Sequence, residues 1–240
     1  MKLTIIFCLS LLSASVRSQS PDSVWYADKI LPNYYIDTGI NLPASVFVDE
    51  QGNRKTLEDY KGKLLYIDVW ATWCGNCLVK FPYQEQLMKR LKAINLDTAV
   101  VFININIDDT KREWKNAVRK YKPTGINLYS SDTSLYEKWN MPYLPAYLLL
   151  DTSNRVLAKQ IAQPDDGSID WILYAASKGI HPVKAVWTMF RQEQLKEQQR
   201  TKTAFTDKGY ADWYTATFPA MFASFQWREK HMRRKRVLPR

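Results

Sequence analysis

The sequence predicts an α/β protein with a mixed central sheet that is covered by helices on both faces. Strand and helix signals alternate between residues 43 and 180. The early strand–helix–strand pattern implies parallel strands, and a later hairpin adds antiparallel ones. A sheet whose strands carry apolar side chains on both faces needs helices on both sides.

The first half of this region contains two expected strands and one long helix. Residues 45–48 predict a strand, which the Gly- and Asn-containing turn at 49–53 ends. The apolar run at residues 64–70 predicts a buried strand. Apolar residues then recur at helical spacing to Leu91, and Pro82 is expected to kink that helix.

The second half repeats the alternation and ends in a hairpin and a helix. Residues 99–105 predict a strand, and residues 110–121 predict a polar, Lys-rich helix. Residues 146–161 predict a hairpin around an Asp-Thr-Ser-Asn turn. A helix over residues 168–177 closes the domain, with Ser168 expected as its N-cap.

The N-terminus, residues 1–18, is typical of a secretory signal peptide. A short basic start precedes about 10 apolar residues, against about 20 needed to span a bilayer. An uncleaved anchor stays open as an alternative. Cleavage would leave Cys74 and Cys77 as the only cysteines of an exported protein, in the periplasm or cell envelope, where disulfides persist.

Charge separates the domain from its C-terminal end. Residues 19–180 carry 19 Lys/Arg and 19 Asp/Glu, whereas residues 181–240 carry 13 and 5. We therefore divide the chain into a lead-in segment (19–42), a domain (43–180) and a basic, aromatic extension (181–240). The extension is expected either to contact an anionic membrane surface or a partner, or to fold against the domain. Nucleic acid is a poor partner for an exported chain.

Cys74 and Cys77 form a Cys-x-x-Cys pair where the expected helix begins. A helix N-terminus stabilises a thiolate, and such cysteines titrate at roughly 3.5–7.5 instead of about 8.5. Cys74 is then expected to attack a disulfide and Cys77 to resolve the mixed disulfide.

Other interpretations of the pair are weaker. Zinc needs two more ligands, and Cys8, His181 and His231 do not have the usual spacing. A peroxidatic cysteine of the peroxiredoxin kind has Thr or Ser three residues before it, whereas Ala71 stands three residues before Cys74. A disulfide that closes so short a loop would stabilise the fold only weakly, but a purely structural role stays open.

Several motifs together resemble one family. They are the segment 68–77, the segment 57–63 with Gly52 before it, the Phe-Pro at 81–82 and the Leu-Pro at 144–145. The chain from about 43 to 177 is similar to the thioredoxin superfamily, specifically the exported TlpA/ResA-type thiol–disulfide oxidoreductases. The resemblance implies a thioredoxin-like fold, protein thiols or disulfides as substrates and an upstream thiol–disulfide electron donor. It implies no metal or organic cofactor.

The resemblance also implies roles for four further residues. Pro145 matches a cis-proline that faces the cysteine pair and leaves Leu144 free to pair with substrate; an ordinary trans proline is the alternative. Asp68 matches a buried acid that exchanges a proton with the resolving cysteine. Its alternative is an aspartate that only makes hydrogen bonds. Trp73 matches an aromatic that shields the first cysteine, with packing alone as its alternative.

Five positions depart from the family pattern. Lys80 stands where a glutamate is usual, and it is expected either to lower the thiolate pKa or simply to be solvated. Asn76 replaces a proline, and Tyr143 and Ala146 replace glycine and threonine beside the Leu-Pro pair. Asn104 appears where a thioredoxin lysine would partner the buried acid.

The sequence therefore favours an extracytoplasmic thiol–disulfide oxidoreductase that acts as a disulfide reductase. The alternative is a thioredoxin-like interaction module with a structural, non-catalytic disulfide.

Overall fold

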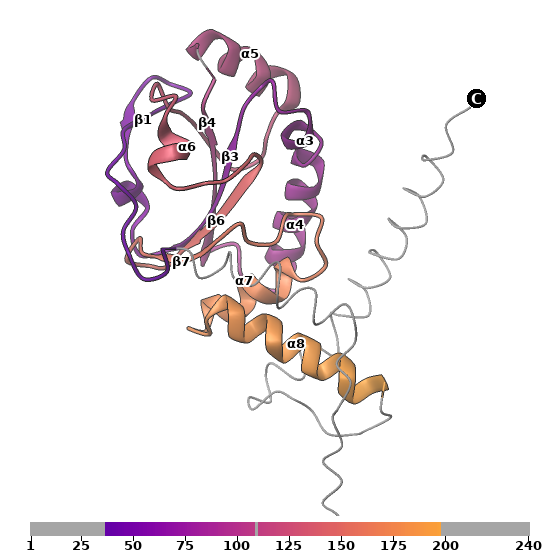
Figure 1. The fold of residues 1–240 in the computed structure, drawn as a ribbon. Coiled ribbons are helices and arrows are strands. Elements are labelled where there is room, and N and C mark those ends of the chain that lie inside the picture. Colours follow the sequence, from indigo (N-terminus) through magenta and orange to yellow (C-terminus); the bar gives the residue numbers. More distant parts are fainter. Residues whose placement is uncertain (1–36, 109, 198–240) are drawn as a thin grey trace, which may run out of the picture.

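The structure, a computed structural model, describes residues 37–108 and 110–197 of the chain (Figure 1). For residues 190–197 it describes only the helical backbone. The expected signal peptide, most of the lead-in segment and residues 198–240 lie outside the described residues.

Seven strands form one mixed sheet in the order β2-β1-β5-β4-β3-β6-β7. The strands are β1 (Phe47–Asp49), β2 (Arg54–Lys55), β3 (Leu64–Trp70), β4 (Val100–Asn106), β5 (Ile126–Tyr129), β6 (Ala146–Leu150) and β7 (Val156–Lys159). β3, β4 and β5 run parallel to one another, and every other pairing is antiparallel. The predicted mixed sheet is confirmed.

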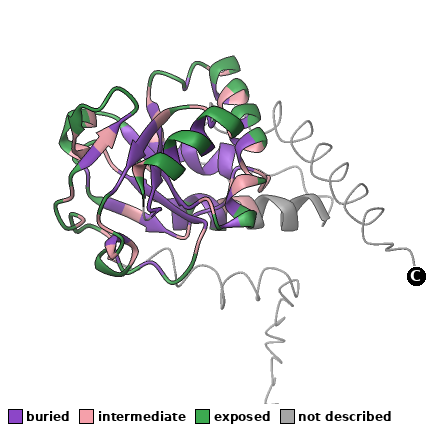
Figure 2. Cartoon of the chain, turned by 90° about the horizontal axis from the view of Figure 1, so that it is seen from above, coloured by how far each residue is buried: buried purple, intermediate pink, exposed green. Residues whose placement is uncertain are grey.

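The helices lie around this sheet and bury it on both faces (Figures 1 and 2). They are the 3-10 helix η2 (Leu57–Tyr60), α3 (Gly75–Leu78), α4 (Phe81–Ala93), α5 (Lys111–Tyr121), α6 (Leu135–Lys138), α7 (Ile169–Ser177) and α8 (Pro182–Glu197). One core joins Ile67 and Ile105 to residues of α5 and α6. The other joins Tyr66 and Phe102 to residues of α4 and α7.

The central strand β3 is buried at all seven positions, which explains why it reads as a continuous apolar run. Its alternate side chains belong to different cores: Ile67 lies on one side and Tyr66 on the other. Asp68 lies two residues after Tyr66, so its side chain starts from the same face of the strand. Its carboxyl is buried there.

One local expectation is corrected, and a second is confirmed for its position only. The helix after the cysteines is not kinked at Pro82 but broken before it: α3 ends at Leu78, and Pro82 lies in the first turn of α4. Proline lacks the N–H that a continuous helix would need there, and it is tolerated in a first turn. Ser168 precedes α7 as its N-cap residue, but its hydroxyl donates to Asp166 (2.6 Å) instead of capping the helix.

Both flanks of the expected domain contact it. Residues just before position 43 lie along β7, where Gly39 donates to the Val156 carbonyl (2.8 Å) and Val156 donates to Ile40 (2.9 Å). On the other side, the first turns of α8 pack on α7, and the Trp171 indole donates to the Ala185 carbonyl (2.7 Å). Among the described helices, none combines the length and apolar character that crossing a membrane requires.

Candidate redox site

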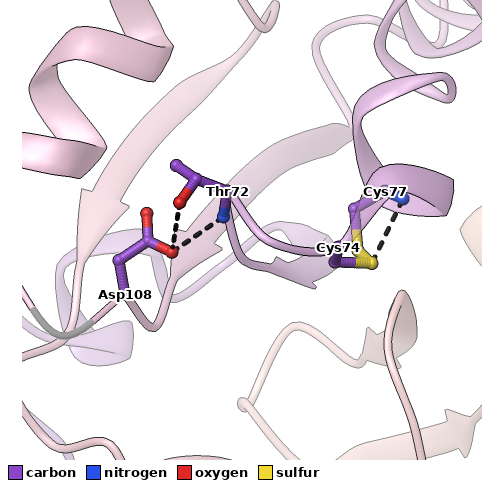
Figure 3. Close-up of a disulfide and its surroundings, with 4 residues drawn as sticks. All are labelled: Thr72, Cys74, Cys77 and Asp108. Carbon is purple, nitrogen blue, oxygen red and sulfur yellow. Dashed lines mark hydrogen bonds between the residues drawn. A yellow bond between two sulfur atoms is a disulfide. The ribbon is translucent and has the colours of Figure 1, made fainter.

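Cys74 and Cys77 form a disulfide where the chain passes from β3 into α3 (Figure 3). Cys74 is the N-cap of α3, and its Sγ accepts a hydrogen bond from the Cys77 backbone N–H (3.2 Å). Cys74 is 8% exposed, whereas Cys77 is fully buried. The two cysteine residues therefore differ in exposure even though they are only one helical turn apart.

The helix behind the pair is shorter than the sequence suggests. α3 contains four residues and is separated from α4 by Val79 and Lys80. A single turn sums few peptide dipoles, so the stabilisation of a Cys74 thiolate comes from the local N–H of Cys77 more than from a long helix dipole.

Thr72, two residues before Cys74, is fixed to the end of β4 (Figure 3). Its backbone N–H and its hydroxyl both donate to Oδ1 of Asp108, at 2.7 and 2.9 Å. The other carboxylate oxygen of Asp108 accepts from the Asn106 side chain (2.9 Å). Asp108 is buried, so this bridge fixes the backbone that carries the cysteine pair.

Sequence reasoning missed Asp108 and Thr72. A signal existed: the carboxyl ends of adjacent parallel strands meet at one edge of a sheet, and β3 and β4 are such strands.

The surface beside Cys74 is an open cleft of about 510 Å³. Leu144 and Trp73 line it, and the Leu144–Pro145 peptide bond is cis, with Pro145 buried. Trp73 and Tyr143 are the large exposed side chains of this rim, at 68% and 53%. None of the described lining residues is charged.

Asp68 lies in β3 and is 1% exposed. Burial raises the pKa of its carboxyl to about 8, although the Tyr147 hydroxyl and the Lys80 ammonium partly lower it. Tyr147 is the residue directly opposite on β6. Within the described residues neither carboxylate oxygen has a hydrogen bond of ordinary length and angle, so the Tyr147 contact is looser than one.

Lys80 is not simply solvated, so one of the two alternatives expected from the sequence is wrong. Its Nζ lies 2.6 Å from Oδ2 of Asp165, which belongs to the loop between β7 and α7. The two side chains are 17% and 22% exposed. Asn104 has other partners: it is in register with Asp68, but its side chain binds Gln84, Thr124 and Asn127.

Residues 37–171 of this sequence match the Redoxin family. The match covers more than half of the chain. The chain belongs to the Redoxin family.

Within this family the chain is similar to the thiol–disulfide oxidoreductase ResA. It is 28% identical to ResA of Bacillus cereus over 125 residues, which is 52% of this chain and 70% of that one. It is 27% identical to ResA of Bacillus subtilis, over 51% of this chain and 66% of the relative.

Solved structures agree on the fold of this Redoxin-family chain. A Bacteroides vulgatus protein assigned as a thiol–disulfide oxidoreductase superposes with a TM-score of 0.52 at 30% identity, covering 57% of this chain and 95% of its own. A Chlorobium tepidum protein assigned as DsbE gives 0.51 at 21% identity, which supports the fold alone, over 59% and 97%.

The expected thioredoxin-like fold and TlpA/ResA-type membership are confirmed, and the enzyme is a thiol–disulfide oxidoreductase. This finding favours a redox role for the pair over the alternative of a non-catalytic interaction module.

Proposed function

We propose that this Redoxin-family enzyme is an extracytoplasmic disulfide reductase in which Cys74 attacks the substrate and Cys77 resolves the mixed disulfide. The observation that carries the proposal is the asymmetry of the pair. Cys74 lines the open cleft and is slightly exposed, whereas Cys77 is fully buried. A protein substrate can reach Cys74, and Cys77 is placed for an intramolecular attack.

The Cys77 backbone N–H supports the attacking role of Cys74. In the reduced enzyme this N–H, which already donates to Sγ in the disulfide, would stabilise a thiolate at Cys74. The thiolate attacks one sulfur of the substrate disulfide, so that a Cys74–substrate bond forms and the other substrate sulfur leaves as a thiolate. Cys77 then attacks Cys74 Sγ and releases the second substrate sulfur. The enzyme dithiol gives up two electrons, and the substrate disulfide takes them.

Asp68 is proposed to accept the Cys77 proton. Cys77 must lose its proton before it attacks, and a carboxyl whose pKa is raised to about 8 by burial exchanges protons near neutral pH. The two substrate thiolates take their protons from solvent, and Asp68 returns its proton to Cys77 when the pair is reduced again.

The substrate is proposed to be an extended segment of a protein that carries a disulfide. Trp73, Leu144 and Pro145 are the binding residues we assign, because Trp73 and Leu144 line the cleft beside Cys74 and the buried Pro145 follows Leu144 through a cis peptide bond. The uncharged lining favours polypeptide recognised by its backbone and apolar side chains, not by fixed charges.

The location and partners are proposals from the sequence. The apolar N-terminal segment motivates export to the periplasm or cell envelope, where an upstream thiol–disulfide donor would return Cys74 and Cys77 to the dithiol. The basic extension, residues 181–240, motivates contact with an anionic membrane surface.

The reduction potential of the pair tests the direction of the reaction. We expect a value nearer that of thioredoxin, about −270 mV, than that of DsbA, about −120 mV, when the protein is equilibrated with defined thiol–disulfide buffers. Dithiol-driven reduction of a protein disulfide is the accompanying activity, with the Cys74→Ser, Cys77→Ser protein as control. A potential near the DsbA value, with no turnover, would make the enzyme an oxidant and refute the reductase assignment.

A further inference from the structure

Helix α5 concentrates positive charge that the rest of the domain lacks. Residues 111–122, which are α5 and the residue that caps its C-terminus, contain six Lys/Arg and one Asp/Glu. The whole segment 19–180 contains 19 of each, so the part outside α5 contains 13 Lys/Arg and 18 Asp/Glu. A net charge of +5 on this one helix is therefore balanced by −5 on the remainder.

Four of these cations share one face of the helix. We call them the α5 basic face: Lys111, Arg112, Lys115 and Arg119. With 3.6 residues per turn they fall within about 100° of one another around the helix axis. Lys111 is half-buried and the other three are exposed. Within residues 37–108 and 110–197, none of the four belongs to an ion pair; Arg119 donates to the neutral side chain of Asn116.

Stability of the helix does not account for this face. Lys115 stands four residues from both Lys111 and Arg119, and like charges at that spacing destabilise a helix. Lys111 and Arg112 also lie in the first turn, where the helix dipole disfavours cations. Binding of an anionic group would offset both effects.

A hollow of about 330 Å³ lies beside the α5 basic face. Lys115 and Arg119 line it together with the buried residues Trp114 and Val118, so cations and apolar groups meet there. Glu50 completes the described lining, and its carboxylate accepts from a side-chain amide of β5 (2.9 Å). A carboxylate side chain of another protein fits this chemistry, because its stem is apolar and its head pairs with a guanidinium or ammonium.

The α5 basic face begins close to the redox cleft. Ile107 lines the cleft, and α5 starts four residues later at Lys111, so their Cα atoms are at most about 14 Å apart. Figure 1 shows α5 and α3 at the same end of the sheet. None of the described cleft-lining residues is charged, so recognition of a charged partner falls outside the cleft.

We propose that the α5 basic face docks an acidic surface of the protein whose disulfide Cys74 attacks. The inference rests on the proposed function and adds a substrate class to it. A partner held by charge at α5 is oriented before its disulfide enters the cleft. Opposite charges also raise the rate of encounter, and added salt reduces this gain. A protein surface is favoured over a membrane, because α5 carries none of the large exposed apolar side chains of the described residues.

The first test compares two synthetic peptides that carry the same internal disulfide. One has a run of glutamates, the other an equal run of glutamines, and a flexible spacer long enough to reach from Cys74 to Lys115 joins each run to the disulfide. At low salt the reduced enzyme should react with the glutamate peptide on the order of tenfold faster. The ratio of the two rates should approach one as salt is added. Equal rates at low salt would overturn the proposal.

Two double variants locate the effect on the surface. Lys115→Gln, Arg119→Gln should bring the ratio of the rates toward one at low salt. The matched control is Lys89→Gln, Lys92→Gln, which changes the net charge equally at exposed lysines of α4 and should keep the wild-type ratio. An equal loss in both variants would mean that net charge alone acts, and the assignment to α5 would be wrong.

The second test measures binding without chemistry. The Cys74→Ser, Cys77→Ser protein, labelled with nitrogen-15, is titrated with the glutamate peptide, and NMR shifts should appear in α5. Shifts confined to residues 181–240, the other basic segment, would overturn the proposal. If the peptide shifts α5 but the wild type reduces neither peptide, the proposed function fails and the docking surface stands.

Anionic vesicles test the competing occupant. Sedimentation with them should be the same for the wild type and for Lys115→Gln, Arg119→Gln. If this variant loses vesicle binding but keeps the rate advantage of the glutamate peptide, the α5 basic face contacts a membrane and the proposed protein partner is wrong.

Discussion

Thr72 gives both its backbone N–H and its hydroxyl to a single oxygen of Asp108, across the ends of two adjacent parallel strands. Figure 3 shows this contact beside the disulfide. The cysteine loop is thus supported from β4 as well as from β3, the strand that leads into it.

Removing this support should destabilise the fold and slow exchange. Asp108→Ala leaves the Thr72 and Asn106 donors without their acceptor, at about 1–3 kcal/mol for each donor that stays buried and unpaired. Thr72→Val removes only the hydroxyl bond and should cost about 0.5–1.5 kcal/mol. Urea unfolding measures both. Asp97→Ala, at an exposed carboxyl, is the control, and equal stability of all three variants would show that the bridge contributes nothing.

The two cysteines should react at different rates. In the reduced protein, Cys74 should alkylate fast and with an apparent pKa below about 8.5, whereas buried Cys77 should be slow. Cys77→Ser should trap mixed disulfides, and Cys74→Ser should not. Mass spectrometry of timed iodoacetamide reactions separates the two sites, and equal rates would remove the assignment of Cys74 as nucleophile.

Asp68→Asn should stabilise the protein at neutral and alkaline pH. Below pH 3.8 the Asp68 carboxyl is neutral in both the folded and the unfolded state. Between 3.8 and about 8 the unfolded state loses this proton and the folded state keeps it, so the free energy of unfolding falls as pH rises.

The gain in Asp68→Asn should therefore grow from pH 4 to 8, to on the order of a few kcal/mol, and level off above 8. Denaturant unfolding of both proteins at several pH values checks this. Exchange near pH 7 should slow in the same variant. A gain that does not depend on pH would mean that Asp68 is not held protonated by burial.

The aromatic rim should matter for large substrates only. Trp73→Ala and Tyr143→Ala remove exposed rings beside the cleft and should raise KM for a protein disulfide several-fold, since each ring contributes apolar contact area. Reaction of Cys74 with a small aromatic-free disulfide should be unchanged. Val79→Ala, which alters an exposed apolar residue outside the cleft lining, is the control; an equal KM in all variants would exclude rim recognition.

Residues 201–240 should bind anionic vesicles at low salt. Electrostatic binding weakens with added salt, because the screening length is about 8 Å at physiological ionic strength. Deleting these residues should abolish sedimentation with anionic vesicles, while phosphatidylcholine vesicles serve as control and reductase activity survives. If the full-length protein ignores anionic vesicles at low salt, the proposed membrane contact is wrong.

The sequence predicted the elements whose signal is local. β3 has the bounds expected from its apolar run, because every residue in it is buried. β5 and α6 were missed: each has four residues, too few for a periodic pattern, and β5 exists because β4 and β1 pair with it.

The same distinction holds at the site. The cysteine pair and the cis-proline were recognisable from contiguous motifs. The contacts of Thr72 with Asp108 and of Lys80 with Asp165 join residues 36 and 85 positions apart, and only the folded sheet brings them together. Lys80 departs from the family pattern, but its partner Asp165 lies in a loop without any motif.

The position of α8 has a practical consequence. This helix leaves the domain below α7, whereas α3, which contains Cys77, lies near the opposite end of the sheet (Figure 1). A fluorophore or surface attachment placed at the C-terminal end of α8 would therefore leave the redox cleft facing outward. The anchored enzyme would stay open to macromolecular substrates, and its turnover on a solid support could be compared directly with that in solution.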